Sequence, residues 1–204
     1  MKSKAKKWNS NMEVFESAPP SYSEAELLDI AKTYFDKTGK IKPLVSERDQ
    51  NARLIDADKE YVIKVANSAE DISLVEFQNA VLNHIAALDP ELAIPKVIVG
   101  KDGQQIFKHN ENNIRLITFL KGDIFGDAPK SNPLYENLGK FLGRFSTTMQ
   151  GFGHPKSHQP DFLWNLDNAM FTKQYIADVE NADDKELVEY FYNRYEKLVI
   201  PRLD

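Results

Sequence analysis

The 204-residue sequence contains no cysteine, which excludes disulfide bonds, thiolate zinc sites and a thiol nucleophile. It has no apolar run near the ~18 residues that a membrane-spanning helix needs, and its lysine-rich start lacks the apolar segment of a secretory signal. Positive charge is not in excess either: the net charge is −5 and the pI about 5.5, which argues against nucleic-acid binding. We therefore expect a cytoplasmic protein.

The sequence does contain enough apolar residues to form a core, since 42% of it is hydrophobic and 11% aromatic. Its composition changes along the chain and predicts four parts. These are a flexible lead-in at residues 1–22, a β-rich unit with one internal helix at 23–122, a linker at 123–133, and a helical part at 134–204.

Local patterns predict the individual elements. Ser23 and Glu26 have the spacing of a capping box, so a helix should start there and end near Gly39. Alternating β-branched and aromatic residues predict strands, and apolar residues at three- and four-residue steps predict helices. The expected strands are 41–46, 52–55, 61–66 and 114–120, with a hairpin of 95–99 and 104–108, and the expected helices are 71–88, 134–150, 167–179 and 183–198.

One charged residue stands inside an apolar strand. Lys64 lies among Tyr61, Ile63 and Val65, and alternation places it on the opposite face of the strand from these three. Glu76 follows in the next predicted helix. A strand lysine and a helix glutamate can together hold a nucleotide phosphate. Both can equally be surface residues, with the lysine stem covering apolar area. Spacing alone leaves the two interpretations open.

Longer stretches of the sequence resemble the aminoglycoside phosphotransferase-like kinase family, in the branch of hydroxylysine kinase and the kinase modules fused to class-III aminotransferases. The stretches are LVSERDQNARLIDADKEYVIKVANSAEDISLVEFQNAVLNHIA, IRLITFLKGDIF, LGKFLGRFSTTMQGFGHP and FLWNLDNA. The resemblance implies an α+β, protein-kinase-like fold. Its N-terminal lobe would be a five-stranded antiparallel sheet with one internal helix, followed by an incomplete helical C-terminal lobe.

The resemblance also implies ATP-dependent transfer of a phosphate to a hydroxyl of a small amine or amino acid, with magnesium in the complete enzyme. Lys64 would contact the nucleotide phosphates and Glu76 would hold it, with Glu70 and Asp71 as nearby alternatives. The turn from Ser46 to Asn51 would lie over the phosphates; it contains no glycine and can also be an ordinary polar turn. The backbone of Thr118, Phe119 and Leu120 would face the adenine, although this strand end can also be plain core.

The family carries its catalytic aspartate and its magnesium ligands beyond the helices that end this sequence, so no catalytic residue is expected here. We interpret the chain as a fragment, a truncated gene product or part of a fusion. The alternative is a non-catalytic remnant that binds nucleotide or protein. In either case the helices after Asn132 should expose apolar surface and promote self-association.

Two histidine patterns have other interpretations. His158, Asp161 and Asn165 miss the spacing of the catalytic loop, because the His–Asp step is one residue too long and the Asp–Asn step one too short. His154 and His158 are four residues apart, but Pro155 argues against a helix that would bring them together as metal ligands. We interpret both histidines as loop residues.

Overall fold

The computed structural model describes residues 17–159, 162 and 165–203. The chain divides into two compact units, Glu13–Ser157 and Met1–Met12 with His158–Asp204. Most of the expected lead-in, at residues 1–16, lies outside the described residues, as do Asp161 and Trp164. The four-part division expected from the sequence stays a prediction, and the two units are described separately below.

The larger unit is built on a five-stranded antiparallel sheet in the order β1-β2-β3-β5-β4. The fold class expected from the sequence, α+β with one helix inside the sheet region, is therefore confirmed. A two-residue turn at Ala57 and Asp58 joins β2 to β3. The strands are β1 (Lys40–Leu44), β2 (Gln50–Asp56), β3 (Lys59–Val65), β4 (Phe107–His109) and β5 (Asn112–Thr118).

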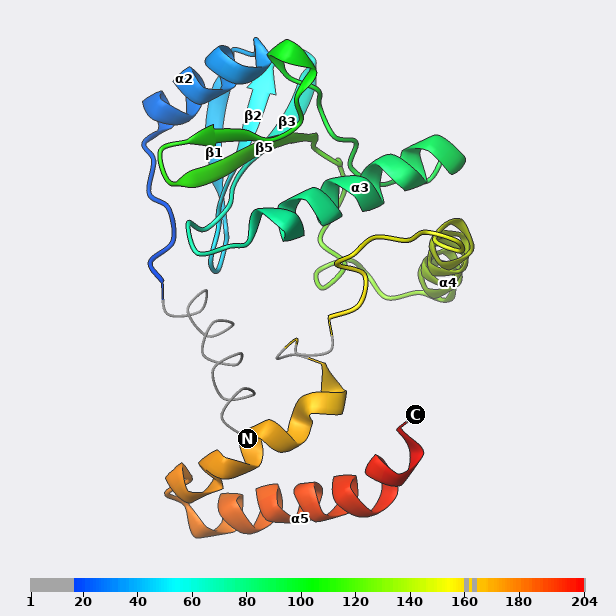
Figure 1. Ribbon diagram of the computed structural model, residues 1–204. Helices are drawn as coiled ribbons and strands as arrows, with labels where there is room; N and C mark the ends of the chain where they lie inside the picture. The colour runs from blue at the N-terminus through cyan, green and yellow to red at the C-terminus, as the bar shows by residue number, and fades with distance from the viewer. Residues whose placement is uncertain (1–16, 160–161, 163–164, 204) are drawn as a thin grey trace. The chain divides into compact units, whose positions relative to one another are not determined.

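Two helices cover opposite faces of this sheet (Figure 1). Helix α2 (Glu24–Phe35) begins with the predicted capping box, in which Ser23 and Glu26 satisfy each other's backbone N–H groups. Helix α3 (Ile72–Leu88) begins at Asp71, whose side chain accepts a hydrogen bond from the backbone N–H of Ser73. The internal helix expected at 71–88 is thus present almost to the residue.

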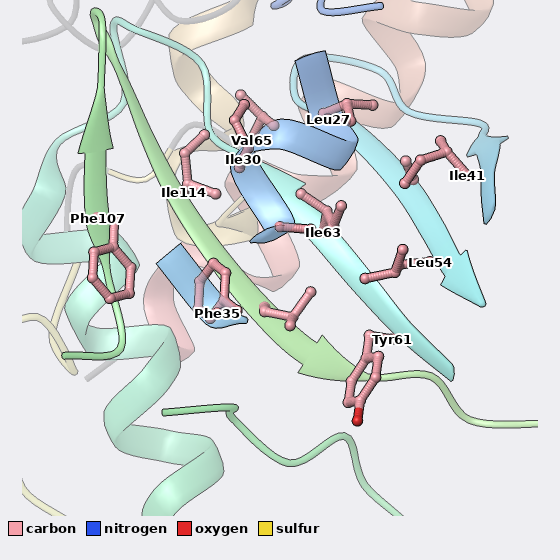
Figure 2. Packing of buried hydrophobic residues seen from close by; sticks show 13 residues of the cluster. Leu27, Ile30, Phe35, Ile41, Leu54, Tyr61, Ile63, Val65, Phe107 and Ile114 are labelled. Carbon is pink, nitrogen blue, oxygen red and sulfur yellow. The ribbon is translucent and has the colours of Figure 1, made fainter. Parts of the chain in front are cut away.

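The α2 face of the sheet is the main hydrophobic core. Val65, Ile63 and Leu54 are fully buried there, together with Ile30 of α2 (Figure 2). Because side chains alternate along a strand, Val62, Lys64 and Ala66 point to the other face, which is the face that α3 covers. The core on one side therefore fixes which residues of β3 are available on the other.

The hairpin predicted at 95–99 and 104–108 is wrong. Both segments pair with β5 and not with each other: Val97 forms an isolated bridge with Ile117, and β4 pairs with the first half of β5. A short 3₁₀ turn, η1 (Lys101–Gly103), separates them. Asp102 and Gly103 do form a turn, but a local turn pattern does not specify with which strand each flanking segment pairs.

Gly39 does not cap the first helix, so the prediction that this helix ends near Gly39 is corrected. The left-handed position after α2 is taken by Asp36, at φ 53° and ψ 44°. Gly39 instead begins the approach to β1, at φ +141°, where an added Cβ would lie 2.0 Å from the backbone oxygen of Ile55. Glycine is required there by the closeness of the next strand as well as by its φ angle.

We expect Gly39→Ala to destabilise the larger unit more than Gly103→Ala does. Gly103 also has a positive φ, +75°, but nothing lies within 4 Å of its added Cβ. It should lose only the ~1–2 kcal/mol of a left-handed alanine. Gly39→Ala must also displace backbone, which adds roughly 2 kcal/mol. Urea unfolding of both variants measures the difference, and equal losses would show that the close approach carries no strain.

A smaller apolar cluster joins α3 to the next helix. Ile85, Leu92 and Ile94 are buried against Phe141 and Phe145 of α4 (Asn132–Thr148). Arg144 of α4 also forms an ion pair with Asp89 at 2.6 Å, just beyond the end of α3. Helix α4 lies two residues earlier than the predicted 134–150, since its cap is Ser131.

In the part that the structure describes, residues 158–159, 162 and 165–203, the smaller unit contains two helical segments and a terminal turn, η3 (Ile200–Arg202). Helix α5 (Ala182–Leu198) agrees with the predicted helix at 183–198. The helix predicted at 167–179 is η2 (Leu166–Asp178), which has 3₁₀ geometry. Tyr195 of α5 donates a hydrogen bond to the backbone oxygen of Leu166 at 2.5 Å, and Lys173 pairs with Glu196 at 2.8 Å, so the two segments contact each other.

Candidate functional site

Lys64 lies on the α3 face of the sheet and its ammonium is oriented by an amide. Its Nζ donates to Oδ1 of Asn51, its register partner on β2, at 2.9 Å. Burial lowers the pKa of Lys64 below its ordinary value, and the positive charge of Arg115 on β5 lowers it further. Lys64 is thus a half-buried cation rather than the extended surface lysine of the alternative interpretation.

The turn between β1 and β2 lies beside Asn51. The hydroxyl of Ser46 accepts a hydrogen bond from the backbone N–H of Asn51 at 3.1 Å, so the two predicted turn residues close on each other. Val45, at the start of the turn, is fully exposed at 104%. The structure therefore brings three of the predicted site residues, Ser46, Asn51 and Lys64, into one continuous group.

Asn67 anchors this turn and was not anticipated from the sequence. It is completely buried just after β3. Its side-chain Nδ2 donates to the backbone oxygen of Arg48 at 3.1 Å, and its backbone N–H donates to the carboxylate of Asp49 at 3.2 Å. These hydrogen bonds from Asn67 fix the conformation of the polar turn, so the turn does not need a glycine. The only sequence signal was an asparagine directly after an apolar strand, which is common in any loop.

Glu76 and Lys64 are not joined by an ion pair or a hydrogen bond among the described residues. It is exposed on α3 and borders an open groove of about 490 Å³, whose lining includes Asn79, Gln105 and His154 but not Lys64. The ion pairs among the described residues do not join Lys64 to any carboxylate. The assignment of Glu76 as partner of Lys64 stays a prediction, which the described arrangement does not support by contact.

The two alternatives to Glu76 are engaged elsewhere. Asp71 caps α3 and pairs with Lys156 at 2.7 Å, and these contacts, led by the one to Lys156, lower the pKa of Asp71 to about 2. Burial raises the pKa of Glu70, next to Asp71 in the chain. Neither carboxylate is within ion-pair distance of Lys64, so α3 and its N-terminus supply no acidic clamp to the lysine in the described part of the chain.

The residue that α3 does hold is Arg115. It is only 6% exposed on β5, in register with Lys64. Its Nη1 donates to Oδ1 of Asn79 at 2.9 Å and its Nη2 donates to Oε1 of Gln78. Arg115 was not among the predicted site residues, although it stands between Ile114 and Leu116 as Lys64 stands between Ile63 and Val65.

The predicted adenine-facing segment follows the end of β5. Two of its backbone N–H groups form hydrogen bonds: that of Thr118 donates to the backbone oxygen of Lys96 and that of Phe119 to the backbone oxygen of Glu60, both at 2.9 Å. Leu120 is 47% exposed, and its backbone N–H has no acceptor among the described residues. Of the three predicted residues, Leu120 is the one whose backbone donor remains available.

Ion pairs of Glu60, at the start of β3, hold this segment in position. Glu60 forms ion pairs with Arg53 on β2 and with Lys121 at 3.3 Å. The guanidinium of Arg53 also lies 4.2 Å from the ring centroid of Phe119. These contacts fix the position of the segment relative to β2 and β3, and hence relative to Lys64.

No group of three or more histidine or acidic residues suited to a metal ion occurs in the described residues. Magnesium, which the resemblance implies for the complete enzyme, therefore has no recognisable ligand set in the described part, and we assign no step to it. No helix in the described ranges is long and apolar enough to cross a membrane.

Comparison with protein families decides what this arrangement belongs to. The model of the phosphotransferase enzyme family matches residues 40–200, which covers most of the chain. The chain belongs to this family. The match includes the sheet from β1, the candidate site and the helices that follow, so the kinase-like resemblance seen in the sequence is confirmed.

Curated relatives are similar over nearly the whole chain. Hydroxylysine kinase of Mus musculus is 26% identical over 207 residues, covering 92% of this chain and 55% of its own length. Hydroxylysine kinase of Danio rerio is 25% identical over 203 residues, covering 90% of this chain and 56% of its own length. The chain thus spans about half the length of the curated relatives that it matches.

Solved structures confirm the fold. A microcompartment-associated aminopropanol kinase aligns with a TM-score of 0.60 and 14% identity, covering 85% of this chain and 56% of the kinase chain. A spectinomycin phosphotransferase, solved with ADP and spectinomycin, aligns with a TM-score of 0.55 and 15% identity, covering 87% of this chain and 55% of that chain. At these identities the likeness shows that the chain has the kinase-like fold.

Proposed function

We propose that this chain holds the nucleotide of a cytoplasmic, ATP-dependent small-molecule kinase. The observation that carries the proposal is Lys64: a partly buried cation on the non-core face of the sheet, held by a neutral amide beside the Ser46–Asn51 turn. A cation that is removed from solvent without a carboxylate partner is stabilised when another anion takes the place of that carboxylate. In the kinase arrangement that anion is the nucleotide phosphate.

The other predicted residues take roles around this lysine. Ser46 and Asn51 shape the turn over the phosphates, and the free backbone N–H of Leu120, next to Thr118 and Phe119, meets the adenine. Residues 23–122 form the nucleotide-binding lobe, 123–133 the linker, and 134–204 the start of the helical lobe. Glu76 remains the proposed partner of Lys64, with no described contact between the two.

The phosphate acceptor that we propose is a hydroxyl of a small amine or amino acid, as in hydroxylysine kinase. The support is the similarity to the hydroxylysine kinases along nine-tenths of this chain. In such a reaction an aspartate would accept the hydroxyl proton, and magnesium would supply positive charge that stabilises the phosphates. No described residue of this chain is assigned either task.

Calorimetric titration of the chain with ATP and with ADP tests the nucleotide role directly. We expect saturable binding of both, competed by each other. Absence of binding at millimolar nucleotide would reject the nucleotide role of this chain and leave the alternative, a non-catalytic lobe that binds a protein. Adding hydroxylysine to the ATP sample and measuring ADP formation separates nucleotide binding from catalysis.

The exposed apolar residues of the helices support a second role, in protein contact. Leu138 and Leu142 of α4 are 38% and 52% exposed, and Leu187 and Phe191 of α5 are 54% and 59% exposed. These helices therefore carry exposed apolar residues, as expected from the sequence. Apolar surface of this kind is typical of interaction sites.

We predict that the chain self-associates through these helices and binds a hydrophobic dye. Sedimentation velocity should show species larger than the 23.3 kDa monomer, in proportions that depend on concentration. Leu142→Glu should reduce dye fluorescence and shift the distribution toward monomer, whereas Lys140→Glu, on the same helix, should not. A clean monomer without dye binding would refute the prediction.

A further inference from the structure

Three side chains form a row across the centre of the sheet. Asn51 on β2, Lys64 on β3 and Arg115 on β5 are successive register partners, so all three lie on the same face. Like charges directly opposite each other in an antiparallel pair repel and destabilise the sheet. The Lys64–Arg115 pair is therefore unfavourable for folding alone and needs another explanation.

The guanidinium of Arg115 is fixed by neutral groups. Both of its described acceptors are side-chain amides of α3, Asn79 at 2.9 Å and Gln78. No carboxylate of the described residues comes within ion-pair distance of Arg115 or of Lys64. Asp49, at the tip of the Ser46–Asn51 turn, is the acidic residue whose field acts on both cations. Amide oxygens orient a cation without cancelling its charge, so the site keeps two positive charges.

Burial increases the effect of these charges on each other. Arg115 is 6% exposed, and burial lowers its pKa to about 10, which still leaves the guanidinium charged at neutral pH. Interactions between charges removed from water are stronger than on the surface. The field of Arg115 on the neighbouring ammonium is therefore substantial.

Lys64 lies between a repelling group and an attracting one. Arg115 is on its β5 side, and the oxygen of Asn51 that accepts its hydrogen bond is on its β2 side. The β2 side is also where Ser46 of the turn accepts the hydrogen bond from the backbone N–H of Asn51. Repulsion and hydrogen bonding thus act on the ammonium in the same direction, toward the turn.

We infer that Arg115 is a positioning residue for Lys64: α3 fixes its guanidinium through Gln78 and Asn79, and its charge holds the lysine ammonium toward Asn51. The inference rests on the proposed phosphate role of Lys64. A helix carboxylate holds such a lysine by attraction and neutralises it. Here a second cation holds it by repulsion, and both charges remain to attract the phosphates.

A charge series at position 115 tests this inference. ADP and adenosine are titrated against the wild-type chain, Arg115→Lys, Arg115→Gln and Arg115→Glu. We expect ADP affinity to fall in steps of about five- to tenfold per unit of charge removed, as a field at this range implies. Arg115→Lys keeps the charge but loses the fork that bonds Gln78 and Asn79, so its ADP affinity should fall between those of the wild type and Arg115→Gln. Adenosine affinity should not change in any of them.

Arg144→Gln is the matched control, since it removes an arginine charge from an exposed ion pair on α4. Its ADP affinity should equal that of the wild type. A structural role of Arg115 would lower ADP and adenosine affinity together, or would make Arg115→Lys as weak as Arg115→Gln. Either result would overturn the inference.

A second variant keeps the test valid should the substitutions of Arg115 prevent folding. Asn79→Ala leaves the guanidinium of Arg115 charged but removes one of its two described hydrogen-bond acceptors. Because Asn79 is only 3% exposed, the substitution should not remove a direct contact between its side chain and the nucleotide. We expect about threefold weaker ADP binding with unchanged adenosine binding. Unchanged ADP binding would count against the inference.

Two failures can be told apart. If the wild-type chain does not bind ADP, the nucleotide proposal falls and this inference falls with it. If the wild type binds ADP and Lys64→Ala does not, but the series at position 115 is flat, the phosphate role of Lys64 stands and the positioning role of Arg115 alone is wrong.

Discussion

Lys64→Ala should weaken ADP binding by about 10- to 100-fold, because a hydrogen bond to a charged group contributes roughly 1.5–3 kcal/mol. The loss should be much smaller for adenosine, which has no phosphate to contact the lysine. Calorimetry of the purified chain with each ligand measures both effects. The result addresses the phosphate role directly, since Lys64 has no described partner other than Asn51.

The same substitution should leave stability nearly unchanged. In the folded chain the ammonium is disfavoured by burial and by Arg115, and both lower its pKa. Its removal relieves this repulsion and loses one hydrogen bond, so we expect a change within about 1 kcal/mol. Lys42→Ala, at an exposed position of β1, is the matched control for loss of a strand lysine. Equal ADP binding by Lys64→Ala and the control would refute the phosphate role.

Ile63→Ala should have the opposite profile, although it is one residue away. Ile63 is completely buried in the core beneath α2 (Figure 2). Truncation of a buried isoleucine to alanine costs about 2–5 kcal/mol, and Ile63→Val about 0.5–1.5 kcal/mol. Urea unfolding followed by circular dichroism measures both losses.

The ADP affinity of the folded fraction of Ile63→Ala should stay close to that of the wild type. The core and the candidate site lie on opposite faces of one strand, so a stability defect and a binding defect can be separated there. A loss of less than about 1 kcal/mol for Ile63→Ala would show that the α2 face is not the main core. A selective loss of ADP affinity would show that the two faces are coupled.

Whether a sequence prediction was right or wrong depended on how far apart in the chain the residues that decide it lie. The capping box at Ser23, the internal helix expected at 71–88 and the faces of β3 depend on neighbours within about four residues, and the structure confirms them. The hairpin around Lys101 and the role of Gly39 were wrong. Both depend on which distant strand lies alongside: β5 in the first case and Ile55 of β2 in the second.

The candidate site shows the same division. The pattern of β3 was enough to single out Lys64, because a charge in an apolar alternation is visible in the sequence alone. The contacts of Arg115 were not visible, because Asn79 lies 36 residues before it and meets it only when α3 packs on the sheet. Asn67 is likewise buried by segments distant in the chain, namely the β1–β2 turn and the residues Ser17 and Ala18 before α2.

The sequence by itself determined the class of this protein. Its order of strands and helices, the lysine in β3 and the stretches that match the phosphotransferase enzyme family specify an α+β kinase-like chain. The tertiary structure decided which groups surround that lysine. It placed Asn51 and Arg115 on either side of Lys64, and Glu76 at the border of a groove whose lining does not include Lys64. The physical reason is that strand register and helix rotation, which act between distant segments, set the distances between side chains, while local patterns set only the faces on which they lie.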